Sequence, residues 1–472
     1  MNSYGAGSAS DRGALDRREL LRGSALLGAG AAAVTLLGGP TPEASASAIA
    51  ASRPAADPAN GVVLFDDPAI NFEALFALGG VAYGAGEVGE IIATVNAINA
   101  RGLSYQSYFD GFLATARRVG QIADEALKAG HRVSARSAYL RSAQYYDQAL
   151  FFVLGTRTPA LEPRVYAWMQ RQWNRATQLF DPPFERIAIP YGHSSLPGYF
   201  LKAQGAWGKR PTVIINNGSD AENVDVWAFG GAATIERGYN ALIFEGPGQG
   251  STLFERQIPF RPDWERVITP IVDYLHSRRD VDTKRIAMTG WSFTGELVIR
   301  AAAFEKRIAA VCADPGSVDT WLAYPAFLRG LFAHGATEAE VNHIWQHEIV
   351  PVLSPSERFL FAKRSEVFAR QFLLTARAGK VLSNFWDFGR RASRYNNLSV
   401  VHKVTAPVLV TSYQLEQFYP GQAQRLFKLL RSSKELVTFT VAEGAEYHDA
   451  PMAPQRRNQV IFDWLDRTLG VH

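Results

Sequence analysis

Short apolar runs separated by helical segments dominate the second half of the chain. Runs of this kind are typical of strands buried in a parallel sheet. They lie at residues 212–215, 241–244, 285–289, 308–313, 408–411 and 436–441. Because strands that alternate with helices build one sheet with helices on both faces, the pattern predicts a doubly wound, mostly parallel α/β fold.

The polar and apolar pattern also predicts a β-hairpin ahead of these runs. Residues 185–190 and 196–201 alternate as strands do, and "GHSS" at 192–195 has the composition of a turn between them. The change from helical to strand spacing falls near Phe184. We therefore expect the sheet to begin with this hairpin.

Two long stretches have helical spacing. In the first, residues 71–182, aromatic side chains recur at helical intervals, as in "AYLRSAQYY" at 138–146, and we interpret them as helix-packing core. The second stretch, 318–401, interrupts the strand pattern, and an insertion of that length is usually functional. Its large aromatic side chains are Trp321, Tyr324, Phe327, Trp345, Phe385 and Trp386. The expected organisation is a helical N-terminal cap region (71–182), an α/β core in two parts (183–317 and 402–472) and a helical cap insertion (318–401).

The first 48 residues have the features of an export signal. Arg17 and Arg18 precede a weakly apolar stretch at 23–39, and small-residue cleavage sites of the Ala-Ser-Ala type follow at 44–48. Paired arginines predict the twin-arginine route. Residues 49–70 would then form a linker. The alternative is an Ala/Gly-rich leader that is never processed.

Composition narrows the function without identifying it. The chain has 472 residues, 47% of them hydrophobic, enough for one large domain with a cap or for two domains. The net charge is only +4 and no basic tract is present, so nucleic acid is not expected as a partner. The single cysteine, Cys312, lies in an apolar run, which predicts a buried, inert thiol. No run beyond the leader is long and apolar enough for a stable membrane anchor, so we expect a soluble exported protein, secreted or in the cell envelope.

"MTGWSFTGEL" at 288–297 places a serine between a strand and a helix. A strand, a sharp turn carrying Ser292 and a helix form the context of a nucleophile elbow, in which the hydroxyl projects above the sheet. Gly290 allows the flanking backbones to approach closely. The usual glycine two places after the nucleophile is Thr294 here, with Gly295 one step later. The alternative is an ordinary polar turn.

A serine nucleophile in this fold needs an acid and then a histidine further along the chain. His448 is the histidine between the last expected strand and the closing helix, so we expect it to be the base. Glu416 is the carboxylate that follows run 408–411, and it would orient the imidazole. Asp314 and Asp319, which follow run 308–313, are the rival acids.

The oxyanion of such a reaction needs two aimed backbone amides. We expect one from Phe293, directly after the nucleophile. The other should come from the loop after run 212–215, "NNGSD" at 216–220, where we predict the amide of Ser219.

Two further patterns are interpreted as structural. The glycine-rich "EGPGQG" at 245–250 contains Pro247, which has no amide proton, and lacks the Gly-Lys-Ser/Thr ending of a phosphate cradle. His343 and His347 are one helical turn apart but lack the His-Glu-x-x-His order and a third ligand, so no metal or organic cofactor is expected.

Several segments together resemble one α/β-hydrolase family, over about residues 71–469. They include "SARSAYLRSAQYYDQALFF", "IPYGHSSLPGYF", "NNGSDAENVDVW", "ERGYNALIFEGPGQG", "GWSFTG", "FYPGQAQRL" and "GAEYHDA". The family contains bacterial 2,6-dihydropseudooxynicotine hydrolase and the fungal hydrolases that shorten polyketide pigment precursors.

The resemblance implies an α/β-hydrolase fold with a helical N-terminal region over the core. It also implies a triad at Ser292, Glu416 and His448 and cleavage of carbon–carbon bonds next to a carbonyl without a cofactor. The chain departs from the family at Glu416, where the loop usually carries aspartates, and at Thr294, where a smaller residue is usual.

We therefore predict an exported, cofactor-independent serine hydrolase acting on a small-molecule carbonyl substrate of apolar or aromatic character. An esterase or acyltransferase that forms the same acyl-enzyme is one alternative. A non-catalytic ligand-binding relative is another, and a homodimer is left open.

The export signal generates the first testable prediction. Replacing Arg17 and Arg18 together by lysine should retain the precursor in the cytoplasm, because the twin-arginine route reads the paired arginines. Fractionation and immunoblotting measure the distribution, and the retained protein should keep its activity. Undiminished secretion of the double variant would contradict the assignment.

Overall fold

A computed structural model describes residues 62–205, 208–333 and 335–471. The predicted export signal at 1–48, and residues 49–61 of the predicted linker, lie outside these residues.

The centre of the molecule is one eight-stranded sheet with the order β1-β2-β4-β3-β5-β6-β7-β8. β1 pairs antiparallel with β2 and β2 antiparallel with β4, and every later pairing is parallel. The strands are β1 Glu185–Tyr191, β2 Ser194–Leu201, β3 Arg210–Asn216, β4 Asn240–Phe244, β5 Val281–Trp291, β6 Ala310–Asp314, β7 Val408–Tyr413 and β8 Lys434–Phe439. The predicted doubly wound α/β sheet is confirmed, and the apolar runs form its strands.

The structure corrects two predicted strand ends. Ser194 and Ser195, predicted as turn residues, belong to β2 and pair with Tyr191 and Pro190. The polar composition suggested that the strand begins after these two serines. Backbone pairing does not depend on the side chains, and it continues through both of them. The last strand stops at Phe439, and Val441 begins a short 3-10 turn, Val441–Glu443.

Helices cover both faces of the sheet. On β5, a side chain at Gly290 would collide with Val298 of α12 (Thr294–Phe304). The neighbouring Thr289 and Trp291 instead line a small space with Ile461 of α19 (Pro454–Leu469). Because successive strand residues point to opposite faces, α12 and α19 lie on opposite sides of the sheet. The other helical elements of the core are α8 Asn223–Val226, η4 Trp227–Gly231, α9 Ala232–Glu236, α10 Gly250–Phe254, α11 Glu265–Ser277 and α18 Gln422–Leu429.

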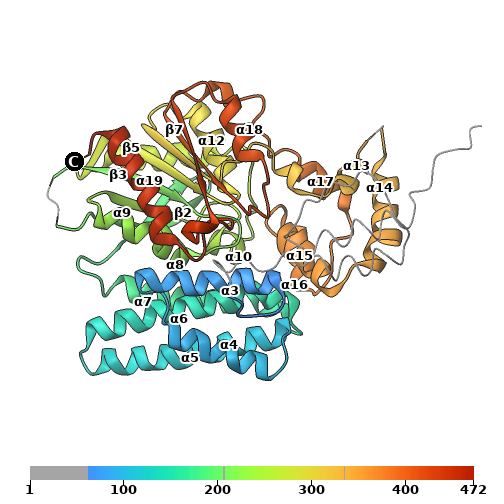
Figure 1. Ribbon diagram of the computed structural model, residues 1–472, viewed down its shortest axis with the longest axis horizontal. Coiled ribbons are helices and arrows are strands. Elements are labelled where there is room, and N and C mark those ends of the chain that lie inside the picture. Colours follow the sequence, from blue (N-terminus) through green and yellow to red (C-terminus); the bar gives the residue numbers. More distant parts are fainter. Residues whose placement is uncertain (1–61, 206–207, 334, 472) are drawn as a thin grey trace, which may run out of the picture.

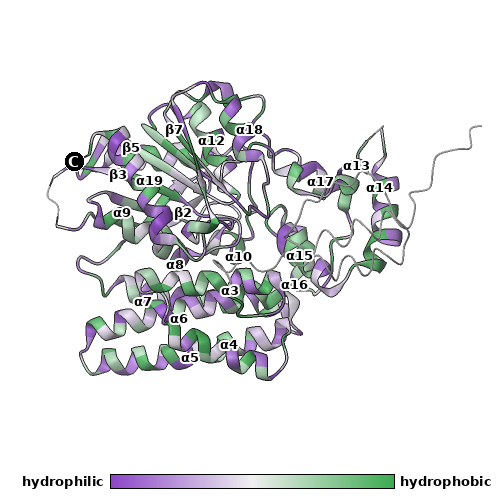
Figure 2. Cartoon of the chain, in the orientation of Figure 1, coloured by the Kyte–Doolittle hydropathy of each residue, from purple (hydrophilic) through white to green (hydrophobic). Residues whose placement is uncertain are grey.

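The N-terminal region is helical and forms a layer against the core, drawn in blue to cyan in Figure 1. Its helices are α3 Pro68–Gly80, α4 Val88–Ala100, α5 Tyr105–Lys128, α6 Arg132–Phe152 and α7 Glu162–Thr177, with short 3-10 turns at Val81–Tyr83, Val153–Gly155 and Pro159–Leu161. α3 begins at Pro68 because the Asp67 carboxylate accepts hydrogen bonds from the amides of Ala69 and Ile70. Along these helices hydrophobic and hydrophilic residues alternate (Figure 2).

Buried polar contacts attach this layer to the carboxyl edge of the sheet. The Tyr166 hydroxyl of α7 donates to the carboxylate of Glu245, directly after β4, at 2.8 Å. The Gln144 side-chain amide of α6 donates to Asp225 of α8 at 2.7 Å. Loops that carry catalytic groups gather at this edge in α/β folds. The helical layer therefore lies beside the edge where the candidate site is expected.

A second helical unit, drawn in orange in Figure 1, is inserted between β6 and β7. Its elements are η5 Thr320–Ala323, α13 Ala326–Gly330, α14 Glu338–Ile344, η6 Trp345–Ile349, η7 Val350–Val352, α15 Pro355–Ser365, α16 Arg370–Arg377, α17 Phe385–Ala392 and η8 Val401–Lys403. The rings of Trp345 and Phe385 are fully buried and stack at 4.3 Å. These two aromatic residues belong to the core of the insertion itself.

No helix among the described residues is long and apolar enough to cross a membrane. Cys312 is fully buried in β6, as predicted, and burial raises the pKa of its thiol well above the ordinary value.

Candidate active site

Ser292 occupies a sharp turn between β5 and α12. Its backbone φ is +51°, in the left-handed region that few residues other than glycine adopt. The Ser292 amide donates to the Asp314 carbonyl oxygen at 2.7 Å, and the Gly295 amide donates back to the Ser292 carbonyl oxygen at 2.9 Å. Side chains at Gly290 and Gly295 would collide with the carbonyl oxygens of Thr294 and Pro315. These contacts hold a nucleophile-elbow geometry in place.

Thr294, a departure from the related sequences, is accommodated by hydrogen bonds. Its buried hydroxyl accepts from the Trp291 amide at 2.8 Å and lies 3.1 Å from the Asn216 carbonyl oxygen. The threonine therefore ties the elbow to the end of β3.

His448 is hydrogen-bonded on both ring nitrogens. Its Nε2 lies 2.8 Å from Ser292 Oγ, and its Nδ1 lies 2.8 and 3.0 Å from the two carboxylate oxygens of Glu416. His448 is only 3% exposed, and water therefore competes little for these bonds. The structure brings together the three residues predicted from the sequence as nucleophile, base and acid.

The surroundings of Glu416 favour its ionised form beside the His448 imidazole. Burial acts to raise the pKa of Glu416, but the His448 charge and hydrogen bonds from His448, Phe418 and Tyr419 outweigh it and lower that pKa. The Phe418 and Tyr419 amides donate to Glu416 Oε1 at 2.9 and 3.0 Å. Glu416 is thus fixed by its own loop, and its longer side chain reaches the ring.

The rival acids do not contact the imidazole. The Asp314 carboxylate accepts hydrogen bonds from Thr411 and Tyr413 and forms an ion pair with Arg457. Asp319 accepts from the Asn396 side-chain amide at 2.8 Å. Both carboxylates are engaged in structural contacts, and Glu416 occupies the position against Nδ1.

The predicted oxyanion amides lie on the two segments next to the nucleophile. Phe293 follows Ser292 at the N-terminus of α12. On the loop after β3, Gly218 approaches so closely that a Cβ there would lie 3.2 Å from the Ser292 Cβ, and Ser219 is the next residue. The amides of Phe293 and Ser219 remain the predicted donors.

Gln249, which was not predicted as a site residue, fixes the loop after β3 by hydrogen bonds. Its side-chain amide donates to the carbonyl oxygens of Asn217 and Gly218 at 2.6 and 3.0 Å, while its Oε1 accepts from the Gly246 amide at 2.9 Å. The glycine-rich segment 245–250 thus braces the loop opposite the elbow. The spacing of glycines in segment 245–250 did not indicate this role, because the contact joins segments that are distant in sequence.

The site is covered by α3 of the N-terminal layer. The Phe72 ring contacts the rings of Phe418 and Tyr447 at 5.8 and 6.4 Å, and Phe418 contacts His448 at 4.7 Å. Next to Phe72, the half-buried Glu73 has no hydrogen-bond or ion-pair partner among the described residues, and burial raises its pKa to about 7. Arg364 of the insertion lies over the Phe418 ring and pairs with Asp220.

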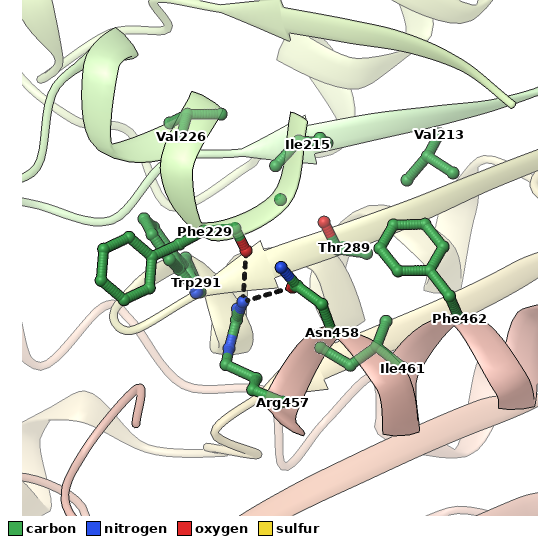
Figure 3. Close-up of a pocket in the computed structure, with 11 residues that line it drawn as sticks. Val213, Ile215, Val226, Phe229, Thr289, Trp291, Arg457, Asn458, Ile461 and Phe462 are labelled. Carbon is green, nitrogen blue, oxygen red and sulfur yellow. Dashed lines mark hydrogen bonds between the residues drawn. The ribbon is translucent and has the colours of Figure 1, made fainter. Parts of the chain in front are cut away.

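A small cavity lies behind the elbow, between the sheet and α19 (Figure 3). Its volume is about 20 Å³, enough for roughly one water molecule. Arg457 lines it and donates to the Phe229 carbonyl oxygen at 2.6 Å. The cavity is too small to hold a substrate.

Metal-ligand residues do not cluster in the part of the chain that the structure describes. No group of three or more His, Cys, Asp or Glu side chains there could hold a metal ion. The rings of His343 and His347 pack against each other at 4.7 Å.

This sheet, this elbow and the buried imidazole beside it define a serine hydrolase of the α/β-hydrolase superfamily. Residues 156–442 match the family described as X-Pro dipeptidyl-peptidase (S15 family), and the chain belongs to that family.

Curated relatives are fungal hydrolases. The chain is 33% identical over 281 residues to the alpha/beta hydrolase psoB of Aspergillus fumigatus, covering 57% of this chain and 61% of that relative's length. It is 26% identical over 448 residues to the alpha/beta hydrolase ucsC of an Acremonium species, covering 85% of this chain and 87% of that protein. The chain thus matches less than two thirds of psoB but most of ucsC.

Among solved structures, 2,6-dihydroxy-pseudo-oxynicotine hydrolase aligns with a TM-score of 0.60 at 18% identity, over 83% of this chain and 95% of that one. AbyA5 aligns with a TM-score of 0.56 at 14% identity, over 83% and 92%. These similarities establish the α/β-hydrolase fold with its N-terminal helical region.

Proposed function

We propose that Ser292, His448 and Glu416 form a catalytic triad that cleaves a carbon–carbon bond next to a carbonyl group. The observation that carries the triad is the pair of hydrogen bonds on one buried imidazole, to Ser292 Oγ and to Glu416. In such an arrangement the carboxylate fixes the ring tautomer and stabilises the imidazolium that forms during the reaction.

In this proposal Ser292 Oγ attacks the substrate carbonyl carbon and its proton passes to His448 Nε2. The amides of Phe293 and Ser219 hold the resulting oxyanion. The tetrahedral intermediate collapses, the carbon–carbon bond breaks, and its electron pair leaves as an enolate that a second carbonyl stabilises. The enolate takes the proton from His448. Water, deprotonated by the same imidazole, then hydrolyses the acyl-enzyme.

Two features support this reaction class. The chain resembles hydrolases that act on β-diketone-like substrates, and one protein with the same fold is a pseudo-oxynicotine hydrolase. In addition, the Phe418 ring contacts the imidazole, and Phe72 contacts Phe418 and Tyr447, so the site has an aromatic surround that suits an apolar or aromatic substrate.

The same acyl-enzyme also serves ester hydrolysis, acyl transfer and peptide cleavage, the last being the activity in the family's description. The intact hydrogen bonds of His448 disfavour a non-catalytic relative, because a protein without turnover has no need to keep them.

A substrate panel tests the proposal. The purified mature protein should cleave benzoylacetone, and Ser292→Ala should lose that activity by several orders of magnitude because the nucleophile is gone. Chromatography measures the products of benzoylacetone cleavage. A p-nitrophenyl ester and a Gly-Pro p-nitroanilide are assayed in parallel as the other two substrates of the panel. Turnover of the ester alone would support the esterase alternative and turnover of the anilide alone a peptidase. No Ser292-dependent turnover of any of them would contradict the proposal.

Replacement of the acid tests the triad itself. Glu416→Gln keeps the shape and removes the charge, so kcat should fall by roughly three to four orders of magnitude. Glu416→Asp restores the charge on a shorter side chain and should recover a substantial part of the loss.

Asp319→Asn is the matched control, since Asp319 is a buried carboxylate without contact to His448, and it should stay near the wild-type rate. Circular dichroism verifies that each variant is folded. A Glu416→Gln variant with wild-type turnover would remove Glu416 from the mechanism.

A further inference from the structure

A second carboxylate lies beside the catalytic nitrogen of His448. Asp449 Oδ2 is 3.4 Å from His448 Nε2, the same atom that is 2.8 Å from Ser292 Oγ. Asp449 is 5% exposed, and its other oxygen, Oδ1, has no hydrogen-bond partner among the described residues. A buried carboxylate left without a full set of partners costs free energy, so its position calls for a physical explanation.

The backbone is strained where it places this carboxylate. Asp449 and Ala450 both have positive φ, 60° and 49°. Aspartate adopts the left-handed region more readily than most side chains, but alanine there is strained, and such strained residues concentrate at functional sites. The turn is closed by the Ala450 amide, which donates to the Tyr447 carbonyl oxygen at 2.8 Å. The fold thus holds Asp449 next to the imidazole at an energetic cost.

We propose that Asp449 is a positioning residue that stabilises the protonated imidazole of His448 from its Nε2 side while Glu416 does so from Nδ1. The inference rests on the proposed triad and adds to it a second negative charge at the atom that receives the serine proton. A triad with one acid stabilises the imidazolium from one side only.

The other charged groups near His448 are already engaged or lie further away. Arg457 of α19 pairs with Asp314 at the end of β6, and Tyr413 of β7 donates to the same carboxylate. Glu73 faces the site from α3, and Tyr419 of the acid loop contacts the His448 ring at 5.7 Å. Apart from Ser292, only Glu416 and Asp449 lie within hydrogen-bond or ion-pair distance of the imidazole nitrogens among the described residues.

This arrangement predicts how kcat/KM depends on pH. Burial acts to lower the pKa of His448, but the charges of Asp449, Glu416 and Asp314 outweigh it and raise that pKa to about 9. Burial raises the pKa of Asp449 itself to about 7, so its charge acts on the imidazole at and above neutral pH. The base must be neutral to accept the serine proton, so activity rises with pH as His448 deprotonates. The acid limb of kcat/KM should therefore lie well above the ordinary histidine pKa of about 6.5.

Removing the Asp449 charge should change this profile in a characteristic way. The carboxylate stabilises the imidazolium in the free enzyme and in the transition state to a similar extent. Below both midpoints, where the free enzyme is already protonated, the rates of variant and wild type should converge. On the high-pH plateau only the transition state carries the imidazolium, so the rate should fall tenfold for each unit by which the midpoint falls.

The experiment is the pH–rate profile of kcat/KM for wild type, Asp449→Asn and Asp449→Gly, measured on the best substrate of the panel. Asparagine and glycine both tolerate positive φ, so neither should disturb the turn. Both variants should move the midpoint down by at least one unit and lower the plateau by the matching factor. Asp319→Asn, the matched control, should leave the midpoint in place.

Equal loss of rate at every pH, with an unmoved midpoint, would assign Asp449 a structural role only and overturn the inference. That outcome differs from failure of the proposed triad, in which Ser292→Ala and Glu416→Gln would keep their activity.

Discussion

The functional part of this molecule depends on one imidazole ring that is hydrogen-bonded on both nitrogens. His448 can bond to Ser292 and Glu416 together only if the ends of β5, β7 and β8 meet at one edge of the sheet. Parallel strands provide that edge, and the order β5-β6-β7-β8 sets the three loops close to one another. The hydrogen bond from the Ser292 amide to Asp314, the ion pair of Asp314 with Arg457 and the brace from Gln249 all keep these loops in place.

Two helical units pack against the loops around the imidazole. α3 brings Phe72 against the loops that carry Glu416 and His448, and α15 brings Arg364 over Phe418. The units are also joined to each other, because Arg377 of the insertion pairs with the buried Glu162 of α7 at 2.8 Å. The loops of the proposed triad therefore pack against two helical units that are far apart in sequence and contact each other.

The sheet was predictable because its strands are continuous apolar runs, whose burial on both faces leaves a clear pattern. Glu416 and His448 were predictable because each is the suitable side chain after its strand. Gln249 and Asp449 were not, since the first acts across a tertiary contact and the second depends on a backbone conformation that composition does not reveal. The sequence pattern also did not show that Trp345 and Phe385 of the insertion stack on each other, because their contact depends on the tertiary packing.

The most direct test of the central claim is covalent labelling of the nucleophile. After reaction of the purified protein with a fluorophosphonate, intact-mass and peptide mass spectrometry should show one adduct, on Ser292. His448→Ala should label far more slowly, because the serine proton then has no acceptor. Labelling at another residue, or an unlabelled wild-type protein, would contradict the claim that Ser292 is activated by an imidazole hydrogen-bonded on both nitrogens.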